Sequence, residues 1–246
     1  MRMIRAFVDA PLAVGQRVTL PENAAAHLVR VMRLREGDAC VLFNGDGRDY
    51  DARLLEAGKR GAVADVVNAR DIDNESTLRI VLLQGIARGE KMDLILQKAT
   101  ELGVARIVPV DAERTEVRLD GERLRKRIEH WRGVVVSACE QCGRARIPEV
   151  ADPVAIADVT RHAGDATLKL TLDPEGAHAL PALAIAPTAT VAIAIGPEGG
   201  WSPRDRDALH AAGFSGLRLG PRILRTETAG LAAIAALQAI YGDLRA

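Results

Sequence analysis

The sequence predicts an α/β protein in which a parallel sheet with covering helices follows a small β-rich domain. Two patterns support this fold class. Residues 1–72 contain short strand-like runs divided by turn signals, whereas strand-like runs alternate with helical patterns from residue 78 onward. The length of 246 residues suits one large domain or two smaller ones, and we place the boundary between residues 72 and 73.

The composition is that of a globular protein with an aliphatic core. Hydrophobic residues make up 48% of the chain and aromatic residues 3%, so Val, Leu, Ile and Ala must supply most of the buried volume. The formal net charge is zero, which gives no global support for nucleic-acid binding. The three cysteines cannot form a disulfide framework, and neither a signal peptide nor a membrane span is evident. We therefore expect a soluble cytoplasmic protein.

The first domain is predicted to be a small β-barrel or sandwich with one helix. Turn signals at Pro21, 44–47 and 58–61 separate its strand-like runs. The helix is expected over 22–31, and the polar segment 71–77 is expected to be a linker. The predicted strands cover 18–20, 39–43, 50–55 and 61–67.

The second domain shows the alternation of a parallel α/β sheet. Its predicted strands cover 80–83, 105–110, 168–172, 190–195 and 216–219. Its predicted helices cover 90–102, 121–142, 203–212 and 229–244. Gly103 is a stop signal for the first helix, and Ser202 with Pro203 forms a start signal for the third.

Three loops rich in glycine, proline and charged residues follow strands of this sheet, at 172–176, 196–200 and 219–229. Ligands bind to such sheets at the carboxyl ends of the strands, so we expect the three loops to form one pocket. The spacing of the glycines matches neither the dinucleotide fingerprint nor the P-loop, which disfavours NAD and ATP.

The loop at 219–229 carries more charge than a connection needs. Gly220 and Pro221 form a turn signal, and Thr228 is placed to cap the last helix. A turn and a cap do not require Arg222 and Arg225, so we interpret these arginines as functional.

The remaining cysteine, histidine and basic motifs point to no metal or redox site, and the basic ones leave two interpretations open. Cys139 and Cys142 form a CxxC pair at a helix end, where a redox pair is atypical and a structural zinc site lacks its second pair. The five histidines show no metal-ligand spacing, and no metal is expected. His27 with the arginines after it, and the basic run at 121–132, are either phosphate contacts or solvated helix surface.

Six motifs resemble the RsmE family, the ribosomal RNA small-subunit methyltransferases of the SPOUT superfamily. They lie at 27–33, 91–93, 97–104, 140–144, 195–200 and 219–229, in the family's order over nearly the whole chain. The departures are small: Met32 stands where leucine is common, and Cys139 and Cys142 stand where many members have other small residues.

The resemblance implies a fold, a cofactor and a substrate that the spacing did not show. Residues 1–72 would form a PUA-like RNA-binding β-barrel, and 73–246 a SPOUT domain with a deep trefoil knot. The protein would be a homodimer that binds S-adenosylmethionine in the knot. It would methylate N3 of one uridine in the decoding region of 16S rRNA, acting on the assembled small subunit.

The resemblance also implies roles for particular residues. Arg225 or Arg222 would stabilise negative charge on the uracil, because arginine stays protonated and cannot be the base. Glu227 or Glu198 would be that base, although these glutamates could instead cap the last helix or bridge a dimer. The residues expected at the cofactor are Leu172, Gly196, Pro197, Gly199, Leu219, Gly220, Ile223, Leu224 and Ala229. The residues expected at the RNA are His27, Arg30, Arg33, Arg114 and Arg144.

Two competing functions remain at this point. One is a SPOUT methyltransferase acting on another RNA position or on tRNA. The other is a ribosome-assembly factor without catalytic activity, which would not need three intact glycine and proline loops.

Overall fold

A computed structural model describes residues 4–58, 61–117, 120–186 and 188–245, and it divides the chain into two compact units. The first unit comprises Met1–Glu75 and Val136–Ile147, and the second comprises Ser76–Val135 and Pro148–Ala246. The predicted linker therefore contains the change of unit, but a later segment returns to the first unit. The two units are described separately below.

The first unit contains a five-stranded sheet in the order β1-β3-β4-β5-β2. Only β1 and β3 run parallel, and the remaining neighbours are antiparallel. Its strands are β1 (Arg5–Phe7), β2 (Arg17–Thr19), β3 (Ala39–Phe43), β4 (Arg48–Gly58) and β5 (Gly61–Asp71). The predicted strands are confirmed, β1 was not predicted, and the predicted turn at 58–61 lies partly outside the described residues.

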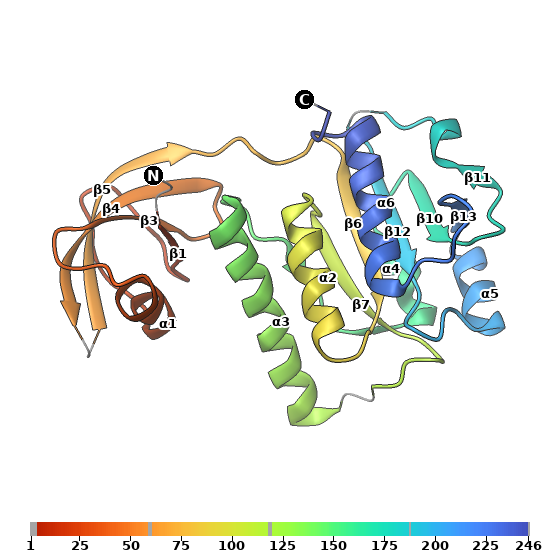
Figure 1. Cartoon of the computed structure of the whole chain (residues 1–246), viewed down its shortest axis with the longest axis horizontal. Helices are drawn as coiled ribbons and strands as arrows, with labels where there is room; N and C mark the ends of the chain where they lie inside the picture. Colours follow the sequence, from red (N-terminus) through yellow and green to blue (C-terminus); the bar gives the residue numbers. More distant parts are fainter. Residues whose placement is uncertain (1–3, 59–60, 118–119, 187, 246) are drawn as a thin grey trace. The chain divides into compact units, whose positions relative to one another are not determined.

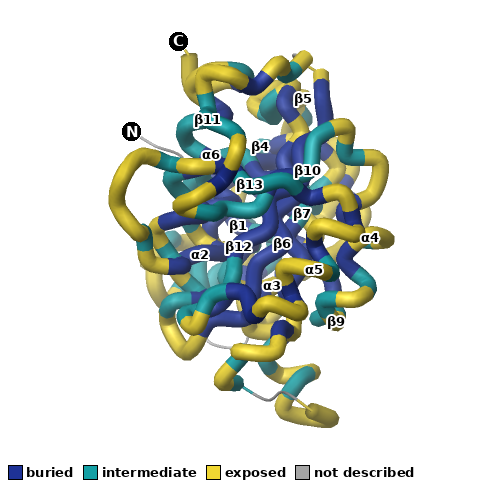
Figure 2. Tube along the Cα trace, turned by 90° about the vertical axis from the view of Figure 1, so that its right-hand side faces the viewer, coloured by how far each residue is buried: buried dark blue, intermediate teal, exposed yellow. Residues whose placement is uncertain are grey.

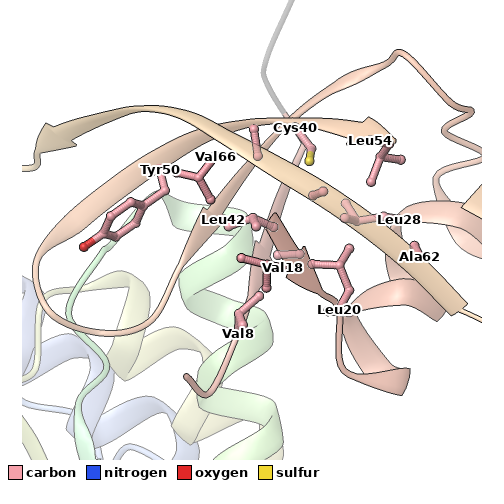
Figure 3. Packing of buried hydrophobic residues seen from close by; sticks show 14 of the residues in the cluster. Val8, Val18, Leu20, Leu28, Cys40, Leu42, Tyr50, Leu54, Ala62 and Val66 are labelled. Atoms are coloured by element: carbon pink, nitrogen blue, oxygen red, sulfur yellow. The ribbon is translucent and has the colours of Figure 1, made fainter. Parts of the chain in front are cut away.

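Alternate side chains of these strands build the core of the first unit. Leu42, Tyr50 and Leu54 lie on the inner face with Leu28 of the helical segment (Figure 3). The predicted helix at 22–31 is confirmed, but it begins as an α-helix, α1 (Glu22–Ala25), and continues as a π-helix, η1 (Ala26–Val31).

The second unit contains a parallel sheet in the order β11-β13-β10-β12-β6-β7-β8, with β9 beside β7. Every strand pair in it is parallel, as the sequence predicts. The strands are β6 (Arg79–Gly85), β7 (Arg106–Asp111), β8 (Glu149–Val150), β9 (Val154–Ala155), β10 (Leu168–Leu172), β11 (His178–Ala179), β12 (Thr190–Ile195) and β13 (Ser215–Arg218). β6, β7 and β12 form the buried centre (Figure 2).

Helices cover both faces of this sheet. They are α2 (Glu90–Glu101), α4 (Val159–His162), α5 (Pro203–Ala211) and α6 (Thr226–Tyr241), with short 3-10 turns η2 (Ile156–Asp158) and η3 (Leu180–Ala182). A further helix, α3 (Gly121–Cys142), begins in this unit and ends in the first unit. Val159 of α4 and Leu209 of α5 share a core with one face of β6, β7 and β12. α2 and α6 pack together on the opposite face, and α6 contacts β6 and β12 (Figure 1).

The helix boundaries largely follow the predicted signals. Gly103, with a φ of +80°, lies two residues after the end of α2, and α3 spans the predicted residues. Ser202 and Asp205 form a reciprocal capping box that starts α5. The last helix is different: it begins at Thr226, three residues early, so Thr228 lies in its first turn and is not the cap.

The order of the strands places β13 between β10 and β11, both of which precede it in the chain. The deep knot implied by the resemblance stays a prediction. No helix in the described ranges is long and apolar enough to cross a membrane.

Candidate active site

The three predicted loops meet in one pocket at the carboxyl edge of the sheet in the second unit. Its volume is about 480 Å³, and it is lined by the ends of β10, β12 and β13 and by the start of α6. Eight of the nine residues expected at a cofactor line it: Leu172, Gly196, Pro197, Leu219, Gly220, Ile223, Leu224 and Ala229. The predicted convergence of the loops is therefore confirmed.

Gly199 is the ninth residue, and it does not line the pocket. Its carbonyl oxygen accepts a hydrogen bond of 2.9 Å from the Arg114 guanidinium, and a Cβ on Gly199 would lie 3.1 Å from the Arg114 Cβ. Gly199 therefore allows the 111–117 segment to approach the loop after β12, which is a structural reason for this glycine.

Close backbone contacts shape the floor of the pocket. A Cβ on Gly85, at the end of β6, would lie 2.5 Å from the Pro197 nitrogen, so only glycine fits there. A Cβ on Gly196 would lie 3.1 Å from Gly200, whose own φ is +65°. The loop after β12 is thus folded tightly on itself and against β6.

A buried hydrogen-bond network joins three elements beneath this floor. The Thr226 hydroxyl donates to the Gly196 carbonyl over 2.6 Å and accepts from the Gln84 Nε2 over 3.0 Å. The same nitrogen of Gln84 donates to the Gly85 carbonyl over 3.0 Å. Both side chains are buried, so the network fixes the start of α6 to the ends of β6 and β12.

The charged residues predicted for catalysis take different positions. Arg222 and Arg225 both line the pocket and are exposed, as a role toward substrate requires. Glu227 does not line the pocket; it is half-buried, and one of its carboxylate oxygens is buried without a hydrogen-bond partner among the described residues. Glu198 does line it.

Glu198 is held as a carboxylate by its neighbours. Partial burial acts to raise its pKa, but hydrogen bonds from the Arg88 N–H, its own N–H and the Lys91 ammonium outweigh burial, so the pKa lies below its usual value. The Lys91 Nζ is 3.2 Å from its Oε1. A carboxylate with a lowered pKa is a weaker base, which disfavours Glu198 as the proton acceptor.

The residues predicted to contact RNA are divided between the two units. Arg30 and Arg33 are exposed at the end of the π-helix, and His27 is half-buried one turn before Arg30. Arg33 is the one non-glycine residue in the described ranges with a positive φ, at 60°. Arg114 belongs to the second unit, where its guanidinium is bonded to the Gly199 carbonyl.

Arg144 does not lie at the surface, so the expectation that it belongs to an exposed RNA-binding surface is wrong. The residue is 5% exposed, and its Nε donates to the Glu75 carboxylate over 3.0 Å. The Arg5 guanidinium also donates to the Arg144 carbonyl. A guanidinium that is buried in this way fastens the segment after α3 to the other residues of the first unit and cannot present itself to a phosphate.

Comparisons with known proteins decide the family. A family model described as an RNA methyltransferase domain matches residues 74–238, and one described as an RNA methyltransferase PUA domain matches residues 20–67. The ribosomal RNA small subunit methyltransferase E of Buchnera aphidicola (subspecies Schizaphis graminum) is 33% identical over 99% of this chain and 98% of its own. That of Mycobacterium tuberculosis is 31% identical over 94% and 89%.

This chain belongs to the ribosomal RNA small subunit methyltransferase E family.

Solved structures of similar proteins agree with this assignment. A ribosomal RNA small subunit methyltransferase E from Neisseria gonorrhoeae, crystallised with S-adenosyl methionine, is 42% identical with a TM-score of 0.94, covering 99% of this chain and 100% of its own. A Legionella pneumophila structure with bound SAM is 37% identical with a TM-score of 0.95, at 99% and 100% coverage. The predicted family, the α/β fold class and the PUA domain are thus confirmed.

Two residues that build the floor of the pocket, Gln84 and Thr226, were not predicted from the sequence. Gln84 is a polar residue directly after the apolar run 80–83, and that position was a usable signal. Thr226 carried no such signal, because nothing in the sequence pairs it with Gly196, thirty residues away.

The cysteine pair at the end of α3 has one thiol whose pKa lies above its usual value. Cys139 and Cys142 are free thiols, and a hydrogen bond with Cys142 together with burial raises the pKa of Cys139, which suppresses its reactive thiolate. In the part of the chain that the structure describes, no three His, Cys, Asp or Glu side chains form a potential metal site.

Proposed function

We propose that this protein transfers a methyl group from S-adenosylmethionine to N3 of a uridine in the decoding region of 16S rRNA, in the assembled small subunit. The observation that carries the proposal is the pocket formed by the loops after β10, β12 and β13 in a member of the methyltransferase E family. We also propose that it acts in the cytoplasm, where its rRNA substrate is found.

The pocket fits a nucleoside-sized cofactor in volume and chemistry. Its 480 Å³ lie within the usual range of small-molecule sites. Leu172, Leu219 and Leu224 supply apolar walls, and the close approach of glycine backbone at 196–200 offers main-chain donors and acceptors. When bound, S-adenosylmethionine supplies an electrophilic methyl group on a sulfonium.

The transfer forms an N3–methyl bond, breaks a sulfur–methyl bond and releases the N3 proton. Positioning should supply much of the rate of such an in-line displacement. Arg225 and Arg222 at the rim of the pocket would stabilise the negative charge that spreads onto the uracil carbonyls. Glu198 lines the pocket, but its carboxylate is held by Arg88 and Lys91. We therefore assign the base to Glu227, which lies next to the pocket-lining residue Thr226 in the chain and has one oxygen without a hydrogen-bond partner among the described residues.

We also propose a homodimer. A groove of about 650 Å³ runs beside α6, lined by Leu180, Pro181, Leu224, Ala232 and Ala236 among others. Ile223, at the pocket, is 86% exposed, and an apolar side chain in that position is typical of a surface that a ligand or partner subunit covers. Sedimentation equilibrium of the purified protein measures the oligomeric state.

The decisive experiment is nucleoside mass spectrometry of small-subunit RNA from a strain that lacks the gene. We expect 3-methyluridine to disappear and to return when the gene is restored. In vitro, purified small subunits from that strain should accept methyl groups, whereas free 16S rRNA and tRNA should not. Retention of 3-methyluridine in the deletion strain would reject the proposal and favour another RNA target or a role in assembly without catalysis.

A further inference from the structure

The first turns of α3 carry a basic stripe, which consists of Arg123, Lys126 and Arg127. Residues spaced by three and four positions are neighbours on a helix surface, so these side chains lie side by side. Arg123 and Lys126 are exposed and Arg127 is partly so. The sequence alone left this segment undecided between solvated surface and a phosphate contact.

The two arginines of the stripe have no carboxylate partner in the described ranges. Lys126 is paired with Glu122 over 2.8 Å, and farther along the helix Arg132 is paired with Asp152 over 3.1 Å. No such pair forms at Arg123 or Arg127. Most of the stripe's positive charge is therefore not neutralised within the protein.

The stripe does not stabilise the helix that carries it. Cations near the amino end of a helix face the positive end of its dipole. Arg123 and Arg127 are also like charges at positions i and i+4, which repel each other. Buried Ile128 and Trp131 hold this part of α3 in place instead, so the fold gives no reason for the two arginines.

The stripe begins at the same edge of the sheet as the pocket. α3 follows β7, and the carboxyl ends of parallel β7 and β12 lie at one edge, where α3 also begins (Figure 1). The segment between β7 and α3 touches the loop after β12 twice: Arg114 donates to the Gly199 carbonyl, and the Ser202 hydroxyl donates to Glu113 over 2.6 Å.

We propose that the basic stripe of α3 binds phosphates of the RNA backbone that flank the target nucleotide. This inference rests on the proposed function, because it places the RNA at the pocket edge. RNA fits better than an acidic protein partner, since a protein interface has an apolar centre and no large apolar side chain is exposed in the described part of 120–135. Arginine forks match phosphate oxygens in two hydrogen bonds.

The test compares Arg123→Gln/Arg127→Gln with the control Arg79→Gln/Arg161→Gln, which removes the same charge elsewhere on the second unit. Arg79 begins β6 at the opposite edge of the sheet, and Arg161 lies in α4. Binding to purified small ribosomal subunits is measured over a range of salt concentrations. The slope of log K against log salt should fall by roughly 1.4–1.8 for two lost phosphate contacts in the stripe variant only.

Further readouts separate a binding role from damage to the fold. In the stripe variant the KM for small subunits should rise while kcat and the affinity for S-adenosylmethionine stay unchanged. Arg123→Lys/Arg127→Lys, which keeps the charge, should keep the wild-type slope. A stripe variant whose slope and KM match those of the control overturns the inference.

If the proposed function is wrong, the wild-type protein will form no 3-methyluridine on small subunits, whether or not the stripe binds RNA. The salt-dependent binding of the stripe variant and its control would still decide the role of the stripe.

Discussion

Thr226 shows how one hydroxyl can hold the floor of the proposed cofactor pocket. Thr226→Val keeps the shape of the side chain but removes the donor to the Gly196 carbonyl and the acceptor for Gln84. Each buried group left unsatisfied costs roughly 1–3 kcal/mol, so we expect a loss of that order in the free energy of unfolding and weaker binding of S-adenosylmethionine. Urea unfolding measures the first loss, and calorimetry measures the second.

Thr226→Ser keeps the hydroxyl and is the matched control. Equal losses in the two variants would contradict the role of the network.

Arg225 at the rim of the pocket is the second residue whose role is open to test. If it stabilises charge on the uracil, Arg225→Ala should lower kcat by about 10²-fold, the usual effect of removing one such donor. The affinity for S-adenosylmethionine should remain, because Arg225 is exposed and its main chain still begins α6. Arg222→Ala in the same methylation assay shows which guanidinium acts. A parallel loss of cofactor affinity and turnover in Arg225→Ala would reject the role.

The variant Glu227→Gln tests whether Glu227 is the base that accepts the N3 proton. Glu227→Gln preserves the size and one acceptor oxygen of a half-buried side chain but cannot take a proton. We expect a large fall in kcat with an unchanged unfolding midpoint, whereas Glu198→Gln should retain much more activity. If the two variants lose activity equally, or if Glu227→Gln mainly unfolds, Glu227 is a structural residue at the start of α6.

At the scale of elements, an ion pair between Arg144 and Glu75 joins the segment after α3 to the N-terminal part of the first unit. Arg144→Ala removes the partner of Glu75, which keeps 27% of its side chain exposed. Because that exposure lets water reach the remaining carboxylate, we expect a loss of about 2–3 kcal/mol, somewhat below that for a fully buried pair. Thermal unfolding measures the loss. The salt dependence of binding to small subunits should not change, and a flatter dependence would return Arg144 to the RNA surface.

Most elements could be predicted because local rules determine them. The strand β12 is an uninterrupted apolar run buried on both faces, and α5 carries its own start signal in Ser202 and Pro203. The pocket followed from the rule that parallel strands end at one edge. By contrast, the pairing of Arg144 with Glu75 joins residues 69 positions apart, and no local pattern distinguishes a buried arginine from an exposed one.

At the scale of the molecule, the same limit explains why the return of a late segment to the first unit was not predicted, while the domain boundary between residues 72 and 73 stays a prediction. The sequence predicts two successive domains, but Val136–Ile147 belongs with the first unit, so the end of α3 lies in a different unit from its start. The helical pattern over 121–142 continues through Gly133 and carries no signal for such a change. The knot implied by the resemblance is likewise a property of chain threading that neither periodicity nor spacing encodes.

Both units of the molecule are expected to contribute to binding of the small subunit. Arg30→Gln/Arg33→Gln removes two exposed charges from the first unit, and we expect weaker binding and a slope of log K against log salt that falls by roughly 1.4–1.8. Arg17→Gln/Arg48→Gln is the matched control in that unit, because Asp65 and Asp71 already offset those charges. Affinity for S-adenosylmethionine should not change in either variant. Combining Arg30→Gln/Arg33→Gln with the α3 stripe variant should add the two free-energy losses if both units contact the RNA at once. A combined loss no larger than the larger single loss would mean that the two units do not contact the RNA at the same time.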